Sequence, residues 1–135
     1  MIMMYDKRTE EKIKISLKYW FKSQTEKEFG EFFLVRTIWM DVLPPLNSKM
    51  IIDVGYEYGV TKAIVEDIVT KLGKDPFNQE FTIYLINERV EPKPMDLENL
   101  EYSYGVSTIE EYKEKLKTLG WDDVYYDIVA FEKEN

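Results

Sequence analysis

Hydrophobic positions in the first third of the chain repeat with the spacing of helices. In the segment 6–22 the apolar residues recur at i, i+4, i+7 and i+8, at Ile13, Leu17, Trp20 and Phe21. The segment 25–43 is apolar nearly all round, which is typical of a central helix that is covered on several sides. Pro44 and Pro45 follow it, and the residue before a proline avoids the helical conformation. The pattern predicts two N-terminal helices.

Beyond residue 45 the pattern predicts alternating strands and helices. A short β-branched run at 50–54 precedes a helical pattern from Thr61 to Leu72. Phe81 to Asn87 is a dense run of β-forming residues. A helix with a capping box of Ser107 and Glu110 follows, and Asp123 to Glu132 is a last strand with two apolar faces.

The length of 135 residues fits one domain. Residues 1–45 form its helical N-terminal part and residues 46–135 its α/β part. The expected fold class is α/β, with a small Rossmann-like sheet and two N-terminal helices. The alternative is an α+β winged helix-turn-helix, in which residues 48–58 are a helix and the turn falls at Gly59.

Composition and charge exclude several classes of catalytic site and favour one class of partner. The chain has no His and no Cys, which excludes Ser-His and Cys-His nucleophiles, thiolates and typical zinc sites. The formal net charge is −8, and residues 51–135 hold 9 basic against 19 acidic side chains. This balance disfavours nucleic acid and favours a basic protein partner. No signal peptide or long apolar run is evident, so we expect a cytoplasmic protein without a membrane segment.

The segment 50–59 contains the one sequence motif that points to a ligand site. Read as a strand followed by a glycine turn, it opens a βαβ unit whose ligand lies beyond the carboxyl ends of the strands. The residues Ile51-Ile52-Asp53-Val54-Gly55-Tyr56-Glu57-Tyr58-Gly59 resemble the first motif of class I S-adenosylmethionine-dependent methyltransferases. The D-V-G-x-x-x-G spacing is most similar to the FkbM-type branch, although the chain is short for the whole fold.

This resemblance implies S-adenosylmethionine as the cofactor. It places Asp53, Gly55, Tyr56 and Gly59 beside the cofactor, and Glu88, after the second strand, on the ribose hydroxyls. The family's catalytic segments have no counterpart in this chain, so catalytic residues stay unassigned and turnover stays open. No spacing typical of a metal site is present.

A second hypothesis needs no catalysis. A small acidic domain without His or Cys suits a binding or inhibitor module that docks on a basic protein surface. Tyrosine pairs suggest a groove for a flat ligand or a partner chain; they are Tyr56 with Tyr58, Tyr102 with Tyr104, and Tyr125 with Tyr126. A helix-turn-helix regulator is the third hypothesis, but residues 47–73 carry 3 Lys against 4 acidic residues.

Overall fold

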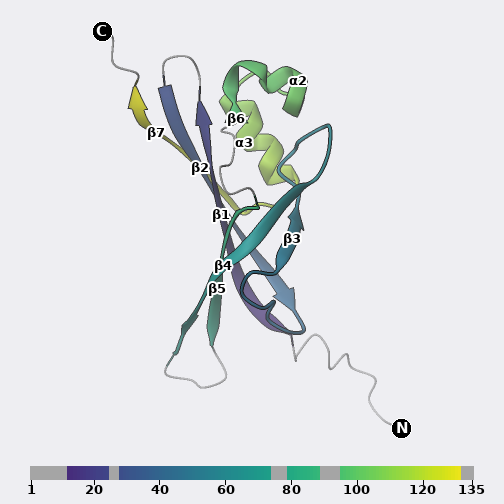
Figure 1. The fold of residues 1–135 in the computed structure, drawn as a ribbon, viewed down its shortest axis with the longest axis vertical. Helices are drawn as coiled ribbons and strands as arrows, with labels where there is room; N and C mark the ends of the chain where they lie inside the picture. The colour runs from purple at the N-terminus through teal and green to yellow at the C-terminus, as the bar shows by residue number, and fades with distance from the viewer. Residues whose placement is uncertain (1–11, 25–27, 74–78, 89–94, 132–135) are drawn as a thin grey trace.

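A single mixed sheet organises the chain (Figure 1). The computed structural model describes residues 12–24, 28–73, 79–88 and 95–131. The sheet of this part has seven strands: six follow the order β3-β4-β5-β1-β2-β7, and the seventh, β6, pairs with the end of β1. In chain order the elements are β1 (Ile13–Gln24), β2 (Glu28–Met40), β3 (Lys49–Ile52), β4 (Thr61–Lys71), β5 (Glu80–Asn87), β6 (Met95–Asp96), a 3-10 helix (Leu97–Asn99), α2 (Leu100–Tyr104), α3 (Ile109–Thr118) and β7 (Asp123–Phe131).

The two predicted N-terminal helices are wrong, because these segments are the antiparallel pair β1 and β2. Ile13, Leu17 and Phe21 are four residues apart, and four is a multiple of the strand period of two as well as close to one helical turn. Strand β2 appears apolar all round because both faces of the sheet carry large apolar side chains along it. Residues 6–11 and 25–27 of the predicted helices lie outside the described residues.

The predicted helix over 61–72 is also wrong, since Thr61–Lys71 is strand β4. A β-bulge between Val65 and Asp67 shifts the register. Ala63 and Val65 lie on one face before the bulge and Ile68 lies on the same face after it, which imitates a helical period. Without this helix there is neither a Rossmann-like βαβ unit nor a helix-turn-helix. The Rossmann-like α/β fold and the α+β winged helix-turn-helix are therefore both wrong: the described residues form a seven-stranded mixed sheet with two short α-helices.

The predictions of two strands and one helix in the second half of the chain are confirmed. Strand β5 covers the predicted run 81–87, and β7 covers 123–131 of the predicted last strand. Helix α3 is present, with its cap one residue later than predicted: the Thr108 side chain accepts a hydrogen bond from the backbone N–H of Glu111 at 3.1 Å. The strand predicted over 50–54 exists as β3, but it is an edge strand, antiparallel to β4.

The hydrophobic core lies on one side of the sheet, here called the inner face. Its buried side chains come from alternate positions of the central strands: Ile15, Leu17, Tyr19, Phe32, Leu34, Ile83 and Leu85. Leu100 of α2 and Tyr112 and Leu116 of α3 join the same cluster. Figure 1 shows both helices together beside one end of the long strands. In the described part of the chain, no helix is long and apolar enough to cross a membrane.

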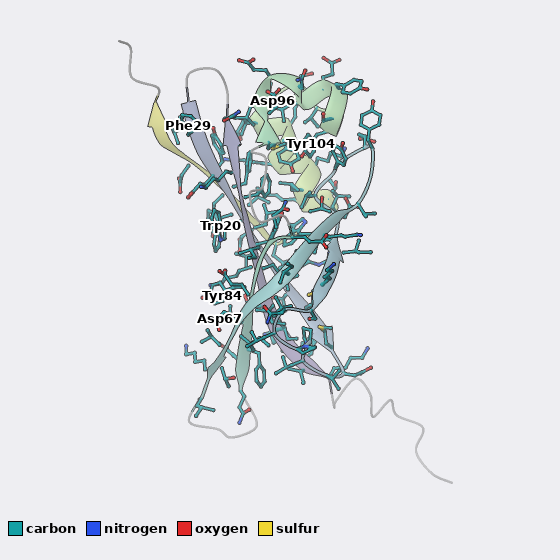
Figure 2. All side chains as sticks on the ribbon, in the orientation of Figure 1. Trp20, Phe29, Asp67, Tyr84, Asp96 and Tyr104 are labelled. Atoms are coloured by element: carbon teal, nitrogen blue, oxygen red, sulfur yellow. The ribbon has the colours of Figure 1, made fainter. Side chains whose placement is uncertain are left out.

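The opposite side of the sheet, here called the outer face, carries no buried side chain on β1, β2 or β7 among the described side chains. Figure 2 shows Trp20 and Tyr84 on the side of the sheet away from Tyr104 and the helices. The outer-face residues of β1, β2 and β7 with described side chains are Lys14, Ser16, Lys18, Trp20, Lys22, Gln24, Phe29, Glu31, Phe33, Val35, Thr37, Trp39, Asp123, Tyr125 and Asp127.

Candidate functional site

The predicted cofactor residues 53–59 lie in the loop between β3 and β4, and local bonds hold this loop. An Asp53 carboxylate oxygen accepts a hydrogen bond from the backbone N–H of Gly55 at 2.9 Å. The Asp53 carbonyl accepts another from the Trp121 indole at 2.8 Å. Gly55 is buried and has a φ of 83°, a conformation that favours glycine. Asp53 and Gly55 therefore shape a turn and do not line an open site.

Two side chains of α3 fasten this loop to the helices. The Lys115 ammonium donates to the carbonyl of Gly55 at 3.2 Å and to that of Tyr104 at 2.6 Å. It also pairs with the Glu57 carboxylate at 2.7 Å. The buried Tyr112 hydroxyl donates to the Val54 carbonyl at 2.7 Å. Sequence reasoning missed the role of Lys115, because three acceptors distant in sequence leave no local pattern.

Four of the predicted groove tyrosines do gather, between this loop and α2. The rings of Tyr58 and Tyr102 stack with centroids 4.9 Å apart, and those of Tyr56 and Tyr104 tilt at 5.7 Å. The pKa of Tyr104 is raised to about 12, mainly by burial and in smaller part by the neighbouring Tyr19 and Tyr56. Tyr104 is therefore a neutral hydroxyl at physiological pH. A Cβ added at Gly59 would meet the Tyr56 ring at an ordinary contact distance of 3.6 Å.

Tyr56 and Glu88 are the two predicted site residues that share a cavity, here called the polar pocket. Its volume is about 510 Å³, and its lining is Tyr56, Val60, Thr61, Lys62, Asn87, Glu88, Met95, Asp96, Ser103 and Tyr104. A hydrogen bond from Lys49 lowers the pKa of Glu88. Asp96 accepts hydrogen bonds from the backbone of Glu98 and the side chain of Asn99. Both carboxylates of the pocket thus already have partners.

A second cavity lies on the outer face and is here called the aromatic groove. It has a volume of about 550 Å³ and is lined by Trp20, Glu31, Phe32, Phe33, Tyr125 and Asp127. Trp20 pairs with Phe33 across β1 and β2, and Phe33 pairs with Tyr125 across β2 and β7. The rings of Phe33 and Tyr125 have centroids 6.4 Å apart. Trp20 is 39% exposed and Tyr125 is 53% exposed, so three strands present an aromatic row to solvent.

Two carboxylates lie beside this row. Glu31 and Asp127 are direct partners across β2 and β7, and each lies two residues along its strand from Phe33 or Tyr125, at the next position on the same face. Like charges at directly opposed positions destabilise a sheet. Lys22 lies opposite Glu31 on β1. In the described ranges, neither Glu31 nor Asp127 takes part in an ion pair. The aromatic groove therefore combines π faces with two acids that belong to no ion pair among the described residues.

Sequence reasoning found only one side chain of this groove. The pair Tyr125 and Tyr126 was expected to line a groove, and the strand divides it. Tyr126 turns to the inner face, where its ring lies 4.7 Å from that of Phe32, while Tyr125 lies in the aromatic groove. Asp127 lies in the predicted last strand, whereas the predicted N-terminal helices contain Trp20, Glu31, Phe32 and Phe33. A strand period in 13–23 and 29–39 would have placed Trp20, Phe33 and Glu31 on one face.

Comparison with known proteins adds no relative. No protein-family model, curated protein or solved structure matches this chain.

Proposed function

We propose that this protein is a binding module without catalysis, and that the outer face at β1, β2 and β7 docks on a basic protein partner. The observation that carries the proposal is the aromatic groove: exposed Trp20 and Tyr125 with the opposed carboxylates of Glu31 and Asp127. Exposed aromatic side chains of this kind are the usual anchors of protein interfaces.

The charge of the groove supports a basic partner. Acidic side chains of the outer face gather on β2 and β7, at Glu31, Asp123 and Asp127, while its lysines follow β1. An acidic patch attracts a basic surface and accelerates the encounter, and it repels phosphates. The formal net charge of −8 acts in the same direction at longer range.

The methyltransferase hypothesis has less support. In that hypothesis the cofactor lies at the N-terminus of a helix that follows Gly59. Residues Thr61–Lys71 form a strand instead. Binding of S-adenosylmethionine and the cytoplasmic location stay predictions.

Binding to an array of peptides that range from acidic to basic tests the proposal. We expect the fluorescently labelled protein to bind basic peptides, and to bind them less as the salt concentration rises. The variant Trp20→Ala combined with Tyr125→Ala is expected to lose this binding. Trp39→Ala is the matched control, because Trp39 is 56% exposed on the same face and lies outside the groove. Binding to acidic peptides, or equal binding by the groove variant, would contradict the proposal.

A further inference from the structure

We infer that the aromatic groove receives the guanidinium of an arginine from an extended segment of the partner. This inference rests on the proposed function and names the ligand chemistry of the same site. Three features of the outer face favour this ligand: the carboxylate pair, the aromatic row and the open edge of β7.

The carboxylate pair favours a cation with several hydrogen-bond donors. Glu31 and Asp127 lie directly opposite each other, so one bound cation relieves the repulsion between both. A guanidinium is planar and carries five N–H donors in a fork, which suits two carboxylates on adjacent strands. An ammonium is a compact, strongly hydrated charge and contacts the two acids less fully.

The aromatic row supplies the second contact. A cation within about 6 Å of an aromatic centroid is attracted by the ring, most strongly by tryptophan. Trp20, Phe33 and Tyr125 form a continuous row next to the two acids. The same protein already shows this type of contact at Lys18, whose ammonium lies 5.7 Å from the centroid of the Tyr84 ring. Arginine stacks on such rings more readily than lysine does.

The edge of the sheet explains how a peptide reaches the groove. Within the described residues, β7 pairs with β2 alone and ends the strand order. An extended segment can add to such an edge through backbone hydrogen bonds, while alternate side chains enter neighbouring pockets. A long side chain on the outer face of that segment lies beside Tyr125 and Asp127, within reach of the groove.

A second copy of the chain fits this edge less well. Antiparallel pairing of two β7 strands would bring the outer-face residues Asp123 and Asp127 of one copy against the same acids of the other. A single-stranded nucleic acid would meet the aromatic row, but its phosphates would approach Glu31 and Asp127. Charge complementarity therefore favours an arginine-bearing segment.

Binding of three blocked peptides by fluorescence anisotropy tests the inference. The peptides are extended threonine–valine sequences with arginine, lysine or the neutral isostere citrulline at alternate positions. We expect the arginine peptide to bind about tenfold more tightly than the lysine peptide, and the citrulline peptide not to bind. The double variant Glu31→Gln and Asp127→Asn should abolish this preference, while Glu66→Gln, at an exposed acid on β4, should leave it unchanged. Circular dichroism checks that each variant is folded.

The variant Lys22→Gln distinguishes an arginine peptide from an oligonucleotide as the ligand, because it should change the two affinities in opposite directions. Because Lys22 lies opposite Glu31, its removal should tighten binding of the arginine peptide and weaken binding of an oligonucleotide. Equal binding of arginine and lysine peptides, or an unaffected double variant, overturns the inference and leaves the proposed function standing. Binding of no basic peptide overturns both. Tight binding of a single-stranded oligonucleotide, or a stable dimer by light scattering, also overturns the inference.

Discussion

Lys115 and Glu57 form an ion pair of 2.7 Å that joins helix α3 to the loop between β3 and β4. The same ammonium donates to the carbonyls of Gly55 and Tyr104. One side chain thus connects α3, α2 and the loop that carries the sequence motif. This loop holds the helices against the sheet, and its glycine serves that attachment.

We predict that Lys115→Met lowers the free energy of unfolding by about 1–3 kcal/mol, because hydrogen bonds to a charged donor are lost and two carbonyls lose a partner. Urea denaturation followed by circular dichroism measures the change. Lys117→Met is the control, since Lys117 is more exposed and pairs only loosely with Glu114 at 3.7 Å, so its loss should change stability by less than about 0.5 kcal/mol. Equal effects of the two variants would refute the role of Lys115.

The two glycines of the motif should respond differently to alanine. Gly55 has a φ of 83°, and a Cβ there would lie 3.2 Å from the Lys115 side chain, so Gly55→Ala should destabilise by roughly 1–2 kcal/mol. Gly59 is exposed, and a Cβ there would meet the Tyr56 ring at an ordinary 3.6 Å. Gly59→Ala should therefore stay within about 0.5 kcal/mol of the natural protein. Thermal denaturation of both variants tests the contrast, and a larger loss for Gly59→Ala would contradict it.

Stability should fall as the pH rises above about 10. Burial raises the pKa of Tyr104 to about 12 and raises the pKa of Tyr112 well above its usual value. Tyrosines of the unfolded chain ionise near 10, so between about 10 and 12 the unfolded chain releases protons that the folded protein keeps. Each such tyrosine lowers the free energy of unfolding by roughly 1.4 kcal/mol per pH unit in this range.

Denaturant unfolding at several alkaline pH values measures this slope, and Tyr112→Phe should make it shallower. The phenolate absorbance of the folded protein supplies a second readout. If all ten tyrosines of the chain ionise together near pH 10 while the protein stays folded, the prediction is wrong.

Removing one acid of the groove should stabilise the free protein. Asp127→Asn relieves the repulsion with its strand partner Glu31, and we expect a gain of a few tenths of a kcal/mol, within the range of roughly 0.2–1 kcal/mol for cross-strand pairs. Differential scanning calorimetry compares it with Asp123→Asn, whose strand partner is Val35. A loss of stability on Asp127→Asn would show that the carboxylate has a favourable partner in the free protein.

The sequence predicts the C-terminal half of the fold better than the N-terminal half. Helix α3 has a polar cap at Thr108, and its apolar positions Tyr112 and Leu116 lie four residues apart and are both buried. Strand β5 is rich in β-forming residues over one short run. In these two elements local preference and burial agree, so single-sequence reasoning succeeds.

The two N-terminal helices are predicted wrongly because of the apolar side chains on the outer face. A strand with one solvated polar face is recognised by its alternation. Trp20, Phe33 and Trp39 are large apolar side chains on the outer face, and they hide the alternation of β1 and β2. The residues that misled the prediction are therefore those of the exposed aromatic face, where sequence and burial disagree.

The three indole groups of the protein give the most direct test of the account. Trp20 lies in the aromatic groove, Trp39 lies elsewhere on the outer face, and Trp121 is buried in the core. In a two-dimensional NMR titration with the arginine peptide, we predict a large shift of the Trp20 indole signal, a small shift for Trp39 and none for Trp121. A Trp20 signal that does not move while the peptide binds, or a shift confined to Trp121, would contradict the assignment of the binding site.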